Sequence, residues 1–441
     1  MSSHEQKFVE GFSKWPKEKK IDWLAGQYLA GFPEGRQILE RYWHPDKQVQ
    51  ALHDGFIENT LGNYWLPFAV APNFLINGRL YAVPMVIEES SVVAAAAKGA
   101  KFWYPFGGFQ ARVKSTVKYG HIHLLYYNDP AKLRAFFETT KDEFLNRLKP
   151  FTANMEKRGG GILSVELEDL TSQLPHYFTV TFRVDTADSM GANFINTILE
   201  EWADYMEEAY SAHGSPGDLE IVMRILSNLN PECTVSVRAS APVEELEKIT
   251  GQKNYAHRLV QAFEMARVNP FRAVTHNKGI MNGMDAVVVA TGNDFRAVEA
   301  GAHSWAAYQR PYTALSQASV HDGQLVLQME VPLTLGTVGG MTRLHPMARL
   351  AMEMLGRPGA RELMQIVASV GLAQNFSAVH SLVTEGIQKG HMKMHLNNIL
   401  AQLGATEEEK QILRTYFHNR KAHVHLVKQA LQDLRNKKLS L

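Results

Sequence analysis

The chain has 441 residues, of which 45% are hydrophobic and 21% are charged. This length allows two or three domains with a large core, and the composition is ordinary for a globular protein. The formal net charge of +1 predicts no overall attraction to nucleic acid or to a membrane surface. The single cysteine, Cys233, excludes an intrachain disulfide framework and a cysteine metal cluster, and favours a reducing cytoplasm.

Membrane and export signals are not apparent in the sequence. Residues Met1 to Phe12 are polar and lack the apolar region of a signal peptide. No stretch approaches the ~18 continuous apolar residues of a membrane span. We therefore expect a protein that is neither exported nor anchored in a membrane.

The first hundred residues mix helices with short strands. Apolar spacing and flanking proline or glycine residues predict helices at Lys17–Leu29 and Asp46–Asp54, and a helix that starts at Val92. The apolar run Leu80–Ile87 predicts a strand. We assign residues 1–110 to the first part of a large mixed domain.

Residues 111–226 show a definite order of predicted elements. Asp129-Pro130 is typical of a helix start, and Asp188 can cap a second long helix. The elements are, in order, the β-rich segment Arg112–Tyr127, a helix from Asp129 to about Lys149, strands Ile162–Leu170 and Tyr177–Asp185, a helix from Asp188, and strand Leu219–Leu226. The order β-α-β-β-α-β is the ferredoxin-like motif. We therefore expect a small inserted domain here.

The chain after residue 226 returns to the large domain and then becomes helical. Helices are predicted at Lys278–Thr291 and Asp294–Tyr308, with a strand at Gln324–Val331. We assign residues 227–375 to the second part of the large domain and residues 376–441 to a helical C-terminal flap. The fold class is α+β.

Adjacent carboxylates follow the first predicted strand, in the segment Glu88-Glu89-Ser90-Ser91. Burial raises the pKa of a carboxyl group, so a partly buried acid here could donate a proton near neutral pH. The alternative is a solvated helix start, where acids are favourable in any case. The residues alone favour this alternative.

A second polar segment runs from Pro270 to Gly283 and combines Arg272, Lys278 and Asn282 with permissive glycines. Such a set can hold a carboxylate and a developing oxyanion. Asp294 follows, and it could meet Lys278 if the intervening helix ends before Gly292. The alternative is a loop with surface polar residues.

Two further segments could bind or react. His391 and His395 have helical i, i+4 spacing, but no HExxH pattern and no third ligand accompany them, so we predict no metal site. His391 could instead protonate a leaving group, or be a plain surface histidine. The segment Asp188–Asn193 opens a helix, whose free N–H groups could bind phosphate. The alternative is an ordinary capped helix, and no GxGxxG pattern supports a Rossmann site.

Taken together, these segments resemble the motif set of class II hydroxymethylglutaryl-coenzyme A reductases, the branch without membrane helices. The matching segments occur in the family's order and are Glu58–Gly62, Val83–Ala94, Asp188–Thr197, Asn277–Gly283, Thr291–Asp294, Gly336–Gly340 and Gly390–Met392. Seven matches in order are specific. Ser90 and Ser189 depart from the proline and alanine that are usual in class II.

The resemblance implies an oxidoreductase that reduces 3-hydroxy-3-methylglutaryl-CoA to mevalonate and coenzyme A in two hydride steps, through a hemithioacetal and mevaldehyde. It implies that Lys278 stabilises the oxyanion, that Asp294 holds Lys278 and Glu89 in one network, and that Glu89 supplies a proton. His391 would protonate the coenzyme A thiolate. Three alternatives remain: the same enzyme degrading mevalonate with NAD, a catalytically impaired homologue that binds coenzyme A thioesters, and a different coenzyme A thioester enzyme.

The resemblance also implies binding residues. The positions matched to the hydroxymethylglutaryl group are Ser91, Arg272 and Asn282. The positions matched to the dinucleotide are Asp188, Met190, Gly191 and Asn193.

The resemblance further implies a cytoplasmic homodimer with its active site at the subunit interface, with a higher oligomer left open. The expected loop Lys149–Gly159 contains no aspartate to repel a 2′-phosphate, and it carries Lys149, Lys157 and Arg158 beside one acid, Glu156. We therefore expect NADPH as the preferred cofactor, with NADH use left open and no metal. The alternative is a solvated loop whose charges face away from the cofactor.

Overall fold

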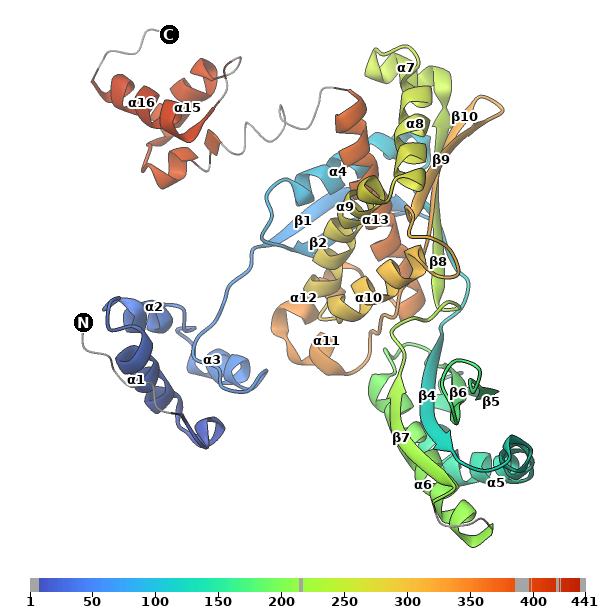
Figure 1. The fold of residues 1–441 in the computed structure, drawn as a ribbon. Helices are drawn as coiled ribbons and strands as arrows, with labels where there is room; N and C mark the ends of the chain where they lie inside the picture. The colour runs from blue at the N-terminus through green and yellow to red at the C-terminus, as the bar shows by residue number, and fades with distance from the viewer. Residues whose placement is uncertain are drawn as a thin grey trace. The chain divides into compact units, whose positions relative to one another are not determined.

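A computed structural model of the chain describes residues 8–213, 217–384, 396–397, 399–417, 420 and 422–436. Contacts between residues divide the chain into two compact units, Met1–Pro67 and Phe68–Leu441. Figure 1 draws the elements with their labels. The predicted boundaries at residues 110, 226 and 375 divide the chain more finely and stay predictions.

The first unit is helical. After a short 3-10 helix, η1 (Phe12–Lys14), it contains α1 (Lys17–Tyr28), α2 (Gly35–Arg41) and α3 (Lys47–Asp54). Both predicted helices are confirmed, and the Asp46 side chain caps α3 by accepting from the backbone N–H groups of Gln48 and Val49. The segment Glu58–Gly62 belongs to this unit, where the Leu61 carbonyl oxygen accepts from the indole of Trp43 at 2.8 Å.

The core of the second unit combines two sheets with long helices. β1 pairs with β2, and a four-stranded antiparallel sheet has the order β3-β8-β10-β9. The strands are β1 (Phe68–Ile76), β2 (Arg79–Val86), β3 (Gln110–Val113), β8 (Thr234–Pro242), β9 (Ser316–His321) and β10 (Gln324–Pro332). The helical elements are α4 (Val92–Trp103), η2 (Tyr104–Phe106), α7 (Val243–Thr250), α8 (Tyr255–Val268), α9 (Pro270–Ala290), α10 (Phe295–Ala306), α11 (Gly340–Leu344), α12 (Pro346–Met354) and α13 (Ala360–Val383).

Helix α13 runs through the centre of this core and packs against α4 and α9. Its length and composition would suit a membrane span, but 78% of its apolar window is buried inside the protein, as in the core helix of a soluble protein. Gly99 of α4 and Gly283 of α9 permit this close packing. A Cβ atom on Gly99 would lie 2.5 Å from the Ala373 carbonyl oxygen, and one on Gly283 would lie 2.9 Å from the Val370 carbonyl oxygen.

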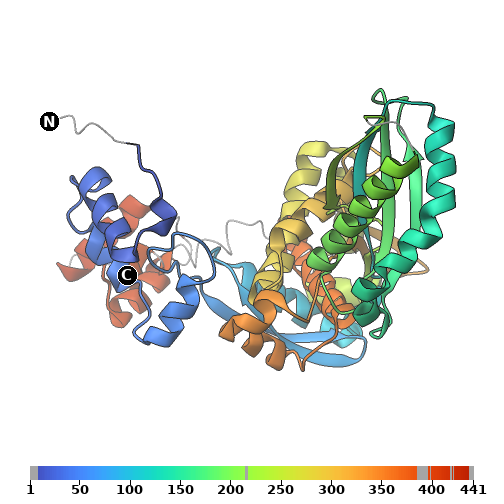
Figure 2. The same cartoon turned by 90° about the horizontal axis from the view of Figure 1, so that it is seen from below.

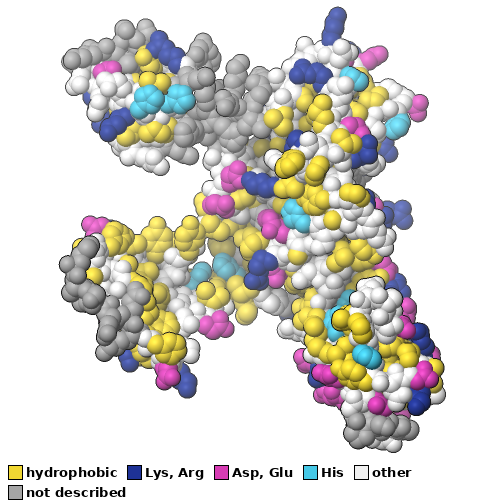
Figure 3. All heavy atoms as spheres, viewed as in Figure 1, with side chains coloured by type: hydrophobic (Ala, Val, Ile, Leu, Met, Phe, Trp, Pro, Cys, Tyr) yellow, Lys and Arg dark blue, Asp and Glu magenta, His cyan; other side chains and the backbone are white. Residues whose placement is uncertain are grey.

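A second four-stranded antiparallel sheet has the order β5-β6-β4-β7 and its own hydrophobic core. Its elements follow the chain as β4 (Val117–Tyr126), α5 (Pro130–Glu156), β5 (Gly161–Asp169), β6 (Tyr177–Asp185), α6 (Ala192–His213) and β7 (Leu219–Leu226). Buried and partly exposed residues alternate along β4, so one face of the sheet packs against α5 and α6 (Figure 2). On the face seen in Figure 3, acidic and basic side chains are interspersed around this part of the molecule.

Two predicted local structures are wrong, and one predicted helix begins earlier than expected. Helix α5 continues through Pro150 to Glu156, so most of the predicted loop Lys149–Gly159 is helical. The buried side chains of Leu148, Thr152 and Met155 continue the helical stripe past the proline, and this packing outweighs one lost backbone hydrogen bond. The predicted helix Lys278–Thr291 is confirmed within α9, which begins earlier, at Pro270. Asp188 does not cap α6, which begins at Ala192.

The C-terminal part contains α15 (Glu407–Tyr416) and α16 (Val424–Arg435), which share a small hydrophobic core. Thr406 and Glu409 form a reciprocal capping box at the start of α15. Helices are therefore observed where the C-terminal residues predict them. His391 and His395 lie outside the residues that the structure describes.

Candidate active site

Glu89 and Lys278 meet on the second unit although 189 residues separate them. The Lys278 ammonium lies 2.8 Å from Oε2 of Glu89, and the amide nitrogen of Asn282 lies 3.4 Å from the same oxygen. Lys278 and Asn282 are four residues apart on α9, so they face the same way. The Lys278 and Glu89 side chains are 59% and 43% exposed, which leaves the pair accessible to a ligand.

The local fold explains how these side chains are presented. Glu89 lies in the connection between β2 and α4, and α9 packs against β2. The opposite side of α9 is buried through Ile280, Met281 and Met284, so Lys278 projects from the exposed side. Ser91 is the last residue before α4 and holds a left-handed backbone conformation with φ of 77°.

Asp294 has other partners in the structure. As the cap of α10, its carboxylate accepts from the backbone N–H groups of Arg296 and Ala297. It also pairs with the Arg296 guanidinium, with Nε–Oδ1 and Nη2–Oδ2 distances of 3.0 and 3.1 Å. Burial acts to raise the pKa of Asp294, but the hydrogen bonds from Arg296 and the backbone outweigh it and lower the pKa. Within the described residues, Asp294 therefore bonds to Arg296 and not to Lys278.

Arg272 lies in the first turns of the same helix, about 1.7 turns before Lys278. Partial burial lowers the pKa of its guanidinium from a very high ordinary value, so it stays charged. The structure thus brings Glu89, Lys278 and Asn282 together. It places Arg272 near the start of α9 and Ser91 just before the start of α4.

A buried polar network that the sequence analysis missed supports α9. His276 shares a hydrogen bond of 2.6 Å with the Ser316 hydroxyl, which lies 2.8 Å from Oδ1 of Asn375. Because Asn375 Oδ1 can only accept, Ser316 donates to it, and Nε2–H of His276 must donate to Ser316. Burial, together with the charge of Arg272, lowers the pKa of His276 to about 3. A neutral histidine therefore joins α9, β9 and α13 close to Lys278. In the sequence, the only signal for this network is that His276 lies in a polar segment.

The turn before α6 is hydrogen-bonded to the start of α13 and to the segment that precedes α11. Oδ1 of Asp188 accepts from the backbone N–H of Ala360 at 2.7 Å, so Asp188 caps α13 instead of α6. The Asp188 carbonyl oxygen accepts from Thr337 N–H at 2.8 Å. A Cβ atom on Gly336 would lie 2.3 Å from Met190 N, so only glycine permits this approach. Gly191, with φ of 89°, precedes α6, in which Asn193 is the second residue.

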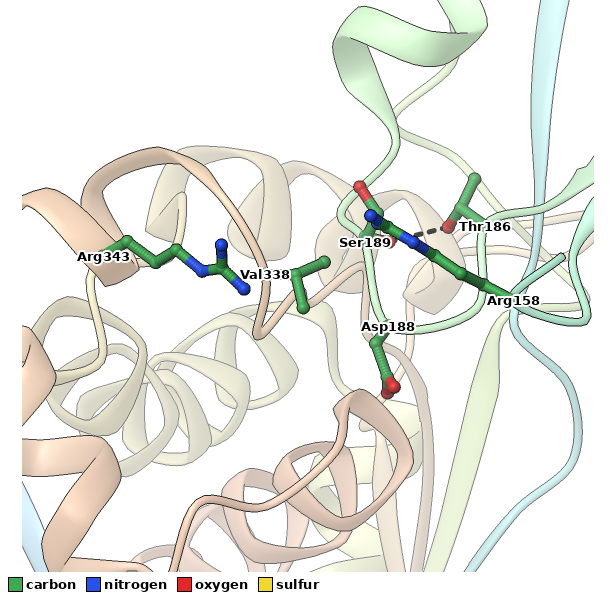
Figure 4. A pocket seen from close by; sticks show the side chains of 6 residues that line it. All are labelled: Arg158, Thr186, Asp188, Ser189, Val338 and Arg343. Atoms are coloured by element: carbon green, nitrogen blue, oxygen red, sulfur yellow. Dashed lines mark hydrogen bonds between the residues drawn. The ribbon is translucent and has the colours of Figure 1, made fainter. Parts of the chain in front are cut away.

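A pocket of about 290 Å³ opens beside this turn, as Figure 4 shows. Its lining residues are Arg158, Thr186, Asp188, Ser189, Val338 and Arg343. Arg158 lies in the segment that was expected to contact the cofactor, whereas Arg343 was not expected there and has only its place just after the segment Gly336–Gly340 as a signal. Such a pocket, with two guanidinium groups and hydroxyl side chains, suits a phosphate-bearing ligand.

A metal ion has no comparable candidate site in the part of the chain that the structure describes. No group of three or more His, Cys, Asp or Glu side chains is arranged there to hold one. The single cysteine, Cys233, is buried, and burial raises the pKa of its thiol. It is therefore a poor candidate for a nucleophile or a ligand.

Comparison with known proteins assigns the family. Residues 34–396 match the sequence model of hydroxymethylglutaryl-coenzyme A reductase. The chain is 36% identical over 430 residues to the 3-hydroxy-3-methylglutaryl-coenzyme A reductase of Archaeoglobus fulgidus, covering 97% of this chain and 95% of that protein. It is 34% identical over 353 residues to a probable enzyme of the same name from Borreliella burgdorferi, covering 78% of this chain and 77% of that protein.

Solved structures agree with this assignment. The class II 3-hydroxy-3-methylglutaryl-CoA reductase from Streptococcus pneumoniae, bound to NADPH in open conformations, is 34% identical with a TM-score of 0.72. The match covers 96% of this chain and all of that chain. The protein described here therefore belongs to the hydroxymethylglutaryl-coenzyme A reductase family and is similar in fold to its class II members.

Proposed function

We propose that this protein reduces 3-hydroxy-3-methylglutaryl-CoA to mevalonate and coenzyme A, with two molecules of NADPH supplying the hydrides. The observation that carries the proposal is the contact of Lys278 with Glu89, which places an ammonium and a carboxyl group at one accessible point. Family membership over nearly the whole chain supports it. NADPH is the ligand of the pneumococcal relative, and the two guanidinium groups of the pocket beside Asp188 suit its phosphates.

Lys278 acts as the oxyanion donor in both half-reactions. Its ammonium has three N–H donors, so it can hold the carbonyl oxygen while it keeps its contact with Glu89. A preorganised donor of this kind contributes roughly 3–4 kcal/mol to the transition state. Glu89 delivers the proton to the aldehyde oxygen of mevaldehyde in the second half-reaction. Its carboxylate first takes up this proton from water, to which the half-exposed side chain has access.

The other catalytic roles come from the family resemblance. His391, outside the described residues, protonates the coenzyme A thiolate and so prevents its return to the carbonyl. Asp294 orients Lys278, which requires a change of partner because Arg296 now holds its carboxylate. Arg272 pairs with the free carboxylate of the substrate, and Ser91 and Asn282 bind the rest of the hydroxymethylglutaryl group. Asp188, Met190, Gly191 and Asn193 hold the dinucleotide through the turn and the start of α6.

The proposal includes the domain organisation and assembly. Residues 1–110 and 227–375 form the substrate-binding large domain, residues 111–226 an inserted ferredoxin-like domain for the dinucleotide, and residues 376–441 the flap. The sheet order β5-β6-β4-β7 with two helices on one face supports the ferredoxin-like assignment. The working protein is a cytoplasmic homodimer with the active site at its interface. The half-exposed Lys278 and Glu89 support this, because a partner subunit would withdraw them from water.

The test is an assay on the purified protein. NADPH should be oxidised on addition of 3-hydroxy-3-methylglutaryl-CoA, with two NADPH consumed for each mevalonate and each coenzyme A released. No oxidation, or release of coenzyme A without oxidation of NADPH, would contradict the proposal. The size of the protein in solution, measured by light scattering, tests the dimer separately.

A further inference from the structure

We propose that Arg158 and Arg343 form a two-sided clamp on a phosphate group of the dinucleotide cofactor, which rests on the cofactor use proposed above. Arg158 follows α5 and Arg343 belongs to α11, so the two residues come from distant parts of the chain. Both line the same pocket of about 290 Å³. In Figure 4 they reach into it from opposite sides, one next to Ser189 and the other next to Val338.

Both guanidinium groups are available for a ligand. In the described part of the chain, neither side chain has a hydrogen bond or an ion pair, and both residues are exposed. Arg357, close to Arg343 in the chain, is by contrast paired with Glu353 at 2.7 Å. A planar guanidinium matches the oxygen atoms of a phosphate with two parallel donors. Two such groups around one pocket can contact one phosphate from both sides.

The acid in the pocket does not cancel these charges. Among the residues that the structure describes, Asp188 is the only acidic one that lines this pocket, and its Oδ1 accepts from Ala360 N–H at the start of α13. The N-terminus of a helix carries partial positive charge, and α13 is 24 residues long. The partial positive charge at the start of α13 therefore offsets much of the negative charge of the Asp188 carboxylate. Two arginines against one compensated aspartate leave the pocket positive.

A buried lysine holds the turn behind the pocket. Lys118 is 3% exposed, and its ammonium donates to the Ser189 carbonyl oxygen at 3.0 Å and to the Thr186 hydroxyl. Thr186 in turn donates to the same carbonyl oxygen at 2.7 Å. The ammonium therefore lies directly behind two lining residues of the pocket. Burial lowers the pKa of Lys118 from its ordinary value, so its part here is to hold the turn through these hydrogen bonds rather than to supply charge to the pocket.

Backbone contacts near the pocket fix the positions of the two segments that carry the clamp. The turn that contains Asp188 and the segment that leads to Arg343 share the hydrogen bond from Thr337 N–H to the Asp188 carbonyl oxygen, at 2.8 Å. Gly336 packs against Met190 with no room for a side chain. A ligand phosphate between Arg158 and Arg343 would therefore meet two donors on a preformed scaffold. This scaffold makes the effects of the two arginines interdependent.

The test uses Arg158→Ala, Arg343→Ala and the double variant, with Arg349→Ala as matched control. Arg349 is exposed and lines the adjoining pocket of about 460 Å³, but not this one. Each single substitution should raise the KM for NADPH about tenfold or more, the usual size for one charged hydrogen-bond partner, with kcat and the KM for 3-hydroxy-3-methylglutaryl-CoA unchanged. The double variant should lose less than the product of the two single effects, because one phosphate is shared.

The arms of the experiment separate the two phosphate sources. If KM rises for NADPH and not for NADH, the clamp holds the 2′-phosphate; if it rises equally for both, the clamp holds the pyrophosphate. Calorimetric binding of adenosine 2′,5′-bisphosphate and of ADP gives the same comparison without turnover, so it remains informative if the proposed reduction fails. The clamp is overturned if either arginine can be removed with no more effect than Arg349→Ala, or if the two losses multiply independently.

Discussion

Replacement of Lys278 by alanine should separate catalysis from stability. At 2.8 Å the attraction between Lys278 and Glu89 amounts to about 1.5 kcal/mol in water. Both side chains are about half exposed, and ion pairs of this kind contribute only ~0–1 kcal/mol to folding. We therefore expect the free energy of unfolding to fall by less than about 1 kcal/mol. Turnover should fall by a factor on the order of 10²–10³ or more, because both half-reactions pass through an oxyanion.

The chain offers a matched control for this experiment. Lys114 forms an ion pair with Glu330 at 2.6 Å, and their side chains are 54% and 34% exposed, which resembles the Lys278 pair. Lys114→Ala should lose a similar amount of stability in urea unfolding and no turnover. Each variant is assayed with 3-hydroxy-3-methylglutaryl-CoA and with mevaldehyde. Near wild-type reduction of mevaldehyde by Lys278→Ala would refute the role given to this residue.

Three further substitutions test the assignments above. His391→Gln should impair reduction of the thioester much more than reduction of mevaldehyde, since only the first half-reaction expels a thiolate; equal losses would contradict its role. In the unfolded chain His276 has its ordinary pKa of 6.5 and binds a proton below that pH, whereas in the native state its pKa is about 3. Between these two pKa values the unfolded state therefore binds more protons, and the free energy of unfolding should fall by about 1.4 kcal/mol for each unit by which the pH drops. His276→Gln keeps the donor to Ser316 and should remove that slope from urea midpoints, whereas an unchanged slope would show that His276 titrates normally. Burial and a hydrogen bond with Glu299 raise the pKa of Asp285, so its contribution to stability is lost as the pH rises above the ordinary carboxyl range. The unfolding free energy of Asp285→Asn should therefore increase relative to that of the wild type between about pH 5 and pH 8. A difference between the two unfolding free energies that stays constant over this range would count against this.

Secondary structure is predictable from this sequence where local patterns and packing agree. Strand Leu219–Leu226 has the predicted bounds, and Asp46 and Asp129 cap the helices that they precede. Each of these signals depends on neighbours within a few residues. Pro150 is the counterexample, because a local rule ends the helix there while buried side chains on the next turn continue it.

Contacts between distant segments are much harder to predict from local sequence patterns. Asp188 has the sequence context of a helix cap, but the helix that it caps begins 172 residues later. Arg343 has no local signature, and only the folded chain brings it to the pocket of Arg158. The family resemblance grouped Glu89 with Lys278, and the structure brings these two together. The structure also pairs Asp294 with Arg296, which lies outside the segments that match the family.

The backbone of Ser91 has a consequence for attempts to make this protein more heat-resistant. Its φ of 77° costs a residue other than glycine about 1–2 kcal/mol of folding free energy. Glycine would avoid this strain but would lose more backbone entropy on folding, so its net gain in stability would be smaller than the strain. Directed evolution for thermal tolerance should therefore accept glycine at this position. The hydroxyl lost by that change is the one that the family match assigns to the substrate. Variants enriched by heating alone would then drift towards folded but slow enzymes, so each round of selection should also score turnover.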